Sequence, residues 1–235
     1  EFVAIAGKCW PAFQTQFGFV PCYVNSRLTK MGIPVSCEVD IYGALSEFIG
    51  TVVSNDAVTL LDINNTVPQD IYDEDIKGKH GKYTLKDTFM GFHCGNTASS
   101  KLSFCEMKYQ MIMARSLPVE VTNGTLEGDI LPGDITFFRL QSTADAKLRA
   151  YIAQGEVLPV ATRSFGAIGI FAIPEMGRFY RHVLIEGNYP HHGAVAFGHF
   201  GKTLYEVFKY IGVDVSEIGY NQPAGVRYPT ENPFA

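Results

Sequence analysis

The sequence predicts an α/β protein, with the end of a doubly wound parallel α/β domain followed by an antiparallel, barrel-like C-terminal domain that has a few helices. Apolar strands alternate with amphipathic helices up to residue 62, and β-type stretches separated by turn sequences dominate thereafter. Hydrophobic residues make up 46% and charged residues 18%, which predicts a large core and excludes a disordered chain. We place the two domains at 1–55 and 56–235.

The first domain is predicted from a β-α-β-α-β run. Apolar stretches are expected to form buried parallel strands, and stretches with a 3.6-residue period are expected to form helices. In chain order these are the strand 2–6, the helix 22–31, the strand 33–39, the helix 41–53 and the strand 58–61. Gly32 would end the first helix, and Asp40 would cap the second. Because about 60 residues are too few for a whole domain of this kind, and the chain begins without Met, we expect a fragment of a longer polypeptide.

The second domain begins with a polar, acidic loop at 63–87 and continues with short β stretches. The expected strands are 89–93, 119–121, 134–140, 150–152, 167–173 and 194–197. Helices are expected at 174–186 and 202–211, and the tail from residue 213 is expected to be irregular.

Net charge, hydropathy and cysteine content argue against three classes of protein. A net charge of −5 and the lack of a Lys/Arg cluster argue against a nucleic-acid partner. A membrane span needs a run of about 18 apolar residues, and the sequence has none. The five cysteines form no CxxC pair and their number is odd, which predicts a reducing, cytoplasmic setting rather than a disulfide framework.

Two carboxylates stand at the ends of consecutive predicted strands. Glu38 lies near the end of an apolar strand, where a buried carboxylate needs a partner, and Asp62 ends the next strand 24 residues later. Each also has an ordinary explanation, an exposed strand end for Glu38 and a turn or cap for Asp62. Because ligands bind at the carboxyl ends of parallel strands, the pair indicates acid/base chemistry or a hard cation.

Three histidines and an asparagine are further candidates. His191 and His192 precede a predicted strand, and because adjacent residues of an extended chain point to opposite sides, only one of them would face a given site. His93 and Asn96 lie in a glycine-flanked segment, which is typical of a tight bend or a close backbone approach. A loop or turn role is the alternative for each residue.

The segment 196–203, AFGHFGKT, matches a relaxed phosphate-binding loop between a strand and a helix. Only 32 residues follow it, too few for the further strands and the second acidic Mg²⁺ ligand of a nucleotide-binding domain. One interpretation is a nucleotide-dependent sugar-modifying enzyme. The simpler interpretation is a strand-to-helix turn in which glycine relieves steric restriction of the backbone.

Two segments resemble L-fucose isomerases. Residues 33–45, IPVSCEVDIYGAL, resemble the family segment GIPVxCExDxxGAL, and the 24-residue step from Glu38 to Asp62 matches the step between the family's two metal-ligand acids. Residues 192–201, HGAVAFGHFG, resemble the family segment HGxxxxGHxG, whose first histidine is the third ligand. These landmarks occur in order over about 165 residues, and the middle β region is only weakly similar.

The resemblance implies a Mn²⁺-dependent ketol isomerase of the L-fucose/L-arabinose isomerase fold, with Glu38, Asp62 and His192 as metal ligands. Two carboxylates and one imidazole suit Mn²⁺ better than a structural zinc ion. In such an enzyme the metal stabilises the enediolate formed when a proton moves between C1 and C2. Glu38 and Asp62 would be the catalytic residues. One would take the proton from carbon and the other would move a proton between the two oxygens, and either residue could have either role.

The same resemblance implies a monosaccharide substrate such as L-fucose or D-arabinose and a homo-oligomer, which is a hexamer in the family. The N-terminal domain of a neighbouring subunit would complete the site. His191 stands where the family has an asparagine that contacts substrate, so His191, His93 and Asn96 are candidate substrate-binding residues. The replacement also motivates an alternative function, a non-catalytic sugar-binding homologue that keeps the isomerase fold.

Overall fold

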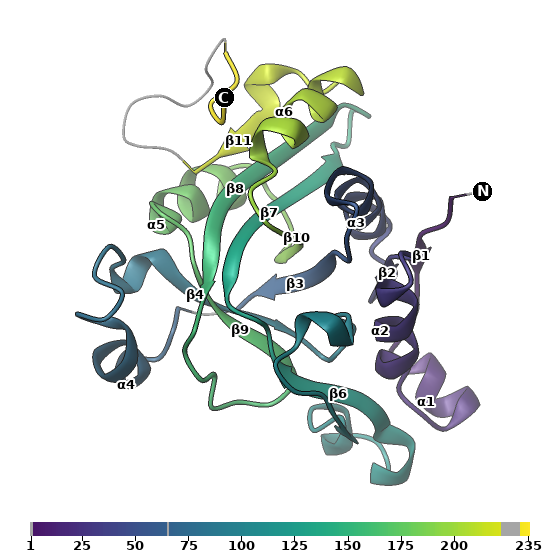
Figure 1. The fold of residues 1–235 in the computed structure, drawn as a ribbon. Helices are drawn as coiled ribbons and strands as arrows, with labels where there is room; N and C mark the ends of the chain where they lie inside the picture. Colours follow the sequence, from purple (N-terminus) through teal and green to yellow (C-terminus); the bar gives the residue numbers. More distant parts are fainter. Residues whose placement is uncertain (1, 65, 222–230) are drawn as a thin grey trace.

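The structure, a computed structural model, describes residues 2–64, 66–221 and 231–235. Within them a large mixed sheet runs through the centre and helices lie on its flanks, which confirms the predicted mixed α/β class (Figure 1). Residues 222–230, part of the tail expected to be irregular, lie outside the described residues. In the described ranges, no helix combines the length and the apolar character needed to cross a membrane.

The N-terminal segment holds a small parallel sheet of two strands, β1 (Ile5–Ala6) and β2 (Val35–Ser36). The prediction of a third parallel strand beside them is wrong, because 58–61 falls in β3 (Thr59–Ile63), which runs antiparallel to two strands of the large sheet. The strand expected to be buried at the N-terminus is also wrong, since Phe2 is 86% exposed. Three helices complete the segment: α1 (Ala12–Phe17), α2 (Cys22–Lys30) and α3 (Ile41–Ser54).

The large sheet of the described residues has nine strands in the order β11-β8-β7-β10-β3-β4-β9-β6-β5. Its other strands are β4 (Thr88–His93), β5 (Glu106–Tyr109), β6 (Asn123–Asp129), β7 (Gly133–Ser142), β8 (Leu148–Leu158), β9 (Ala167–Ala172), β10 (His192–Phe197) and β11 (Ile218–Tyr220). Most neighbours are antiparallel, but β6 with β9 and β8 with β11 are parallel pairs.

Strand β8 pairs with β9 as well as with β7, so the pairings among β8, β7, β10, β3, β4 and β9 return to their starting point. All six strands contribute side chains to one buried apolar cluster, which includes Leu61, Phe89, Phe137, Tyr151 and Phe171. Strands β3 and β10, which carry the site residues Asp62 and His192, contribute Leu61 and Val195 to this cluster.

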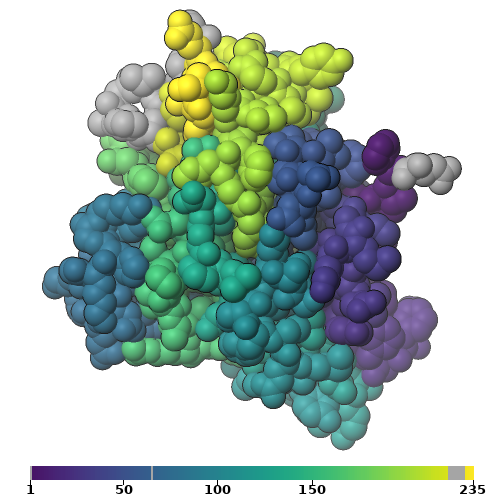
Figure 2. Space-filling model, viewed as in Figure 1, coloured from purple at the N-terminus to yellow at the C-terminus, as the bar shows by residue number. Residues whose placement is uncertain are grey.

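Helix α3 joins the N-terminal segment to the large sheet. Its residues Ile49 and Val53 pack in a second core cluster that also contains Phe138 of β7 and Leu204 of α6 (Gly201–Tyr210). Figures 1 and 2 show α3, in blue, beside α6, in yellow-green, on the same face of the molecule.

Several local predictions are wrong. The expected strand 119–121 is a 3-10 helix (Val119–Thr122), because a run this short does not distinguish a strand from a helical turn by its period. The helix expected at 174–186 is divided into α5 (Met176–Phe179) and a π-helical segment (Tyr180–Ile185). The expected loop 63–87 contains α4 (Gln69–Ile71), followed by a π-helical turn.

Candidate metal centre

His192 and Asp62 meet across two antiparallel strands. His192 begins β10 and lies directly opposite Asp62 of β3 in the register, so their side chains project from the same face of the sheet. Nε2 of His192 lies 3.1 Å from Oδ1 of Asp62. Both atoms are buried, and neither makes an aligned hydrogen bond within the described residues.

Glu38 approaches the same nitrogen from outside the large sheet. Its Oε2 lies 3.7 Å from Nε2 of His192, and its side chain is 52% exposed. Glu38 and Val39 both have left-handed backbones, with φ of 60° and 59°. Such a conformation is costly for non-glycine residues, especially a β-branched one, and it is found where the surrounding structure fixes a functional side chain.

Asp40 binds the other side of the His192 ring. Its Oδ2 lies 2.9 Å from Nδ1 of His192, and its two oxygens accept hydrogen bonds of 2.7 and 2.8 Å from the guanidinium of Arg139. Oδ1 also caps α3 by accepting from the backbone N–H of Gly43 at 2.8 Å. The imidazole therefore lies between two carboxylates, with Asp40 on one nitrogen and Asp62 near the other.

These contacts determine the charges in the cluster. Burial opposes protonation of His192, but the interactions with Asp40 and Asp62 outweigh it and raise the pKa of His192 to about 9. Burial would raise the pKa of Asp62, yet the interactions with His192 and His93 lower it below the ordinary value. Without a bound cation, the cluster is a protonated imidazole between ionised carboxylates.

The donor set fits a divalent cation. Two atoms bonded to one octahedral ion at about 2.1 Å are separated by about 3 Å, which is close to the 3.1 Å between Oδ1 of Asp62 and Nε2 of His192. Both atoms are buried without an aligned hydrogen bond among the described residues, which a polar atom tolerates poorly unless something else satisfies it. Carboxylate oxygens and imidazole nitrogen suit Mn²⁺ and similar hard to borderline ions.

His191 and His93 extend the cluster on either side. His191 is exposed, and its Nε2 lies 3.7 Å from Oδ1 of Asp62. His93, at the end of β4, is buried, and its ring centroid lies 5.9 Å from that of His192. Two sets of ligand atoms therefore lie close enough to hold one ion, Glu38 with His191 and His192, and Asp62 with His93 and His192.

The tautomer of His93 follows from its backbone contact. Its Nδ1 accepts a hydrogen bond from the N–H of Cys94 at 2.9 Å, so the ring proton is on Nε2. Burial lowers the pKa of His93, which keeps this ring neutral. His93 is thus a hydrogen-bond donor beside the cluster.

Asn96 is buried but is turned toward the N-terminal segment. Its Nδ2 donates to the carbonyl oxygen of Val35 in β2 at 3.3 Å. This hydrogen bond links Asn96 to the small parallel sheet. Asn96 therefore supports the β2 segment that precedes Glu38.

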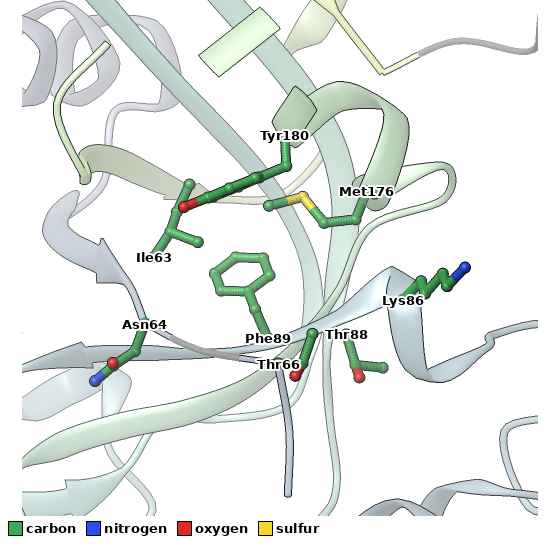
Figure 3. A pocket seen from close by; sticks show the side chains of 9 residues that line it. Ile63, Asn64, Thr66, Lys86, Thr88, Phe89, Met176 and Tyr180 are labelled. Atoms are coloured by element: carbon green, nitrogen blue, oxygen red, sulfur yellow. The ribbon is translucent and has the colours of Figure 1, made fainter. Parts of the chain in front are cut away.

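Two hollows share the side chain of Ile63, the residue that follows Asp62 in β3. A cavity of about 220 Å³ is lined in part by Ile63, Phe89 and Tyr180, and Figure 3 shows these three side chains around it. A second hollow of about 480 Å³ shares Ile63 and Tyr180 and reaches His191. Because His191 contacts Asp62, this second hollow opens at the edge of the cluster and offers room for a small ligand.

The segment 196–203 does not have the geometry of a phosphate-binding loop. The N–H of Phe200 donates to Oγ1 of Thr136 at 2.8 Å, and the N–H of Gly201 donates to Oε1 of Gln154 at 2.7 Å. Backbone donors that would bind phosphate are therefore used inside the protein, which favours the interpretation as a strand-to-helix turn.

Two residues of the cluster are missed by sequence reasoning. Asp40 is interpreted from the sequence only as a helix cap, and Arg139 is not among the candidate residues. The available signal was the position of Arg139 between Phe138 and Leu140 in an apolar strand, because a charge in such a run requires a buried partner.

Comparison with known proteins finds similarity to the C-terminal domain of a sugar isomerase family. A family model described as "L-fucose isomerase, C-terminal domain" matches residues 91–219, which include His93, Arg139 and His192. Glu38 and Asp62 precede the matched residues.

Similar curated proteins are sulfoquinovose isomerases. Those of Priestia megaterium and Alkalicoccus urumqiensis are 24% identical over 217 residues and 26% identical over 225 residues, which cover 91% and 92% of this chain. A third, from a Clostridium species, is 28% identical over 162 residues, 66% of this chain and 30% of the relative. The chain spans 44% of the length of the first two relatives, less than half of each.

Proposed function

Because the chain belongs to the L-fucose isomerase family through its C-terminal domain, we propose that it carries the metal-binding part of an aldose–ketose isomerase active site. The observation that supports this most strongly is the pair of buried atoms without aligned hydrogen bonds, Oδ1 of Asp62 and Nε2 of His192. Glu38, Asp62 and His192 would hold the cation, and the chemistry of this donor set favours Mn²⁺.

The reaction needs two proton transfers and no net oxidation. A proton leaves C2 and a proton is delivered to C1, while the hydroxyl proton of O2 moves to O1. A bound divalent cation would supply polarisation of the two sugar oxygens. Glu38, the more exposed carboxylate, would take the proton from carbon and return it. Asp62, whose pKa is lowered by His192 and His93 despite its burial, would move the proton between the oxygens.

We propose two classes of sugar as candidate substrates. The sequence segments around Glu38 and His192 resemble L-fucose isomerases, which favours L-fucose or D-arabinose, whereas the curated relatives are named for sulfoquinovose. His191 lines the hollow beside the cluster and would be a contact for either class of sugar. We propose that the full-length protein acts as a homo-oligomer.

The metal requirement gives the direct test. The full-length protein is incubated in D₂O with L-fucose, D-arabinose or sulfoquinovose, with Mn²⁺ or after EDTA treatment, and the products are followed by NMR. We expect isomerisation of at least one sugar, deuterium at C1 of the ketose, and a loss of turnover of at least about 10²-fold on chelation that Mn²⁺ restores. Turnover that is indifferent to EDTA would contradict the proposal, and sugar binding without product would favour the non-catalytic homologue.

The affinity for Mn²⁺ is expected to depend on pH through His192. Its pKa lies near 9, so below pH 9 the ring must release a proton before Nε2 binds a metal. The apparent association constant should therefore rise by up to about tenfold per pH unit toward pH 9 and level off above it. Calorimetric titrations with Mn²⁺ between pH 6 and 9, in buffers of different ionisation enthalpy, measure both the slope and the released proton. A flat profile would show that His192 is not the titrating ligand.

A further inference from the structure

We propose that Asp40 and Arg139 form a positioning pair that holds both the imidazole of His192 and the segment carrying Glu38 in the arrangement that binds the cation. The inference rests on the proposed function, because the position of these groups matters through the metal site. It concerns two residues outside the set of ligands.

The carboxylate of Asp40 is surrounded by donors. Oδ1 accepts from the backbone of Gly43 and from Nη2 of Arg139, both at 2.8 Å. Oδ2 accepts from Nη1 of Arg139 at 2.7 Å and lies 2.9 Å from Nδ1 of His192. Four donors from three groups leave this carboxylate little freedom, so its position relative to the imidazole is fixed.

The contact with Asp40 decides which nitrogen of His192 is available to a ligand. An ionised carboxylate accepts hydrogen bonds only, so Nδ1 of His192 must carry the proton that points to Oδ2 of Asp40. Nε2 is then the nitrogen that can offer a lone pair, and it is the one that lies beside Asp62 and Glu38. A carboxylate on the second ring nitrogen is a common way for proteins to orient a metal-binding histidine.

Arg139 holds the histidine by its main chain as well. Nη1 of Arg139 donates to the carbonyl oxygen of His192 at 3.2 Å, in addition to its bond with Asp40. The side chains of Arg139, Asp40 and His192 are only 5%, 12% and 6% exposed. A buried, bidentate contact of this kind has a defined geometry, which a flexible lysine would not reproduce.

The same pair links Glu38 to the large sheet. Glu38 and Val39 form the left-handed turn that leads into Asp40, the cap of α3. In the described chain, β1 and β2 pair with each other and with no strand of the large sheet. The bond from Asp40 to Arg139 therefore ties the end of this turn to β7, and it sets the distance between Glu38 and His192.

Close packing at the start of α3 supports the assignment of Asp40 as a positioning residue. A Cβ atom at Gly43 would lie 2.6 Å from Oδ2 of Asp40 and 2.8 Å from Oγ of Ser36. The residue at this position must therefore be glycine for the Asp40 carboxylate to occupy its place.

The test compares two arginines on neighbouring strands in the full-length protein. Arg139→Lys keeps the charge but loses the bidentate contact. Arg149→Lys is the matched control, because Arg149 lies on the neighbouring strand β8, pairs with Glu217 at 3.4 Å and also donates to a backbone carbonyl. Mn²⁺ affinity is measured by calorimetry, and the directly bonded imidazole nitrogen is detected by electron spin-echo envelope modulation of the bound Mn²⁺.

We expect Arg139→Lys to weaken Mn²⁺ binding by about 10- to 100-fold and to reduce the nitrogen modulation, with Arg149→Lys unchanged within about twofold. Should Arg139→Lys fail to fold, Asp40→Asn replaces it, since asparagine keeps the size and the capping oxygen. Unchanged affinity and modulation in a folded variant would overturn the positioning pair alone. Wild-type protein that binds no Mn²⁺ would overturn the proposed function first, and this inference with it.

Discussion

Replacement of Glu38 by glutamine in the full-length protein is expected to lower isomerase turnover by about 10²- to 10⁴-fold without loss of the fold. The amide has the shape of the carboxylate but neither accepts a proton from carbon nor contributes charge to a cation. The side chain is 52% exposed and lies 3.7 Å from Nε2 of His192, and an exposed ion pair of this kind contributes about 0–1 kcal/mol to stability, so the variant should fold. Steady-state rates with Mn²⁺ measure the loss, and thermal melting followed by circular dichroism checks the fold.

Glu120→Gln is the matched control for this variant. Glu120 is exposed in the 3-10 helix Val119–Thr122, so the substitution makes the same chemical change far along the chain from the cluster. It should leave turnover within about twofold of wild type, as surface substitutions are usually near neutral. If Glu38→Gln keeps more than a tenth of the wild-type rate, Glu38 is not a proton carrier.

The second large effect is expected on stability, from Gly155→Ala. A Cβ atom at Gly155 would lie 2.3 Å from the carbonyl oxygen of Ala172 and 2.8 Å from Cγ1 of Ile173. The first of these atoms belongs to the backbone, so β8 and β9 would have to separate where they pair. Overpacking of a core costs about 1–3 kcal/mol and occasionally more, and we expect the upper end. At about 2–4 °C per kcal/mol, the melting temperature should fall by about 6–12 °C.

Gly81→Ala serves as the control for this steric argument. A Cβ atom at Gly81 would meet no atom within 4 Å, and the residue has no left-handed backbone. Its melting temperature should stay within about 2 °C of wild type. Equal melting temperatures for the two variants would mean that β8 does not approach β9 as closely as the structure has it.

Local sequence patterns predicted several elements of the fold, but they did not predict how the strands pair. Helix α3 follows from the 3.6-residue period after Asp40, and the structure confirms both the helix and its cap. Strand β3 was assigned to the wrong sheet, because an apolar run such as Val58-Thr59-Leu60-Leu61 suits a buried parallel strand and a central antiparallel strand equally. One of its two neighbours, β10, lies more than 100 positions away along the chain, and local patterns carry no information about such a pairing.

The proximity of Glu38 and Asp62 to His192 was predictable from the sequence, whereas the contacts that support these residues were not. Family membership is confirmed by the model of the C-terminal domain, and the structure places Glu38 and Asp62 near the same nitrogen of His192. Their roles remain predictions. The contact between Asp40 and Arg139 joins residues 99 positions apart. Its geometry arises only when α3 packs on the sheet, so neither spacing nor composition indicated it.

The alternation of side chains along β10 has a consequence for how length changes would be tolerated. The side chain of His192 projects toward Asp62 on one face of the sheet. The next position along β10, Gly193, faces the opposite side, where a Cβ atom would meet the ring of Phe137. One amino acid added inside β10 would exchange the two orientations and turn the imidazole into the aromatic core. Added before Pro190, in the connection that follows the π-helical segment, the same amino acid would only lengthen a surface loop.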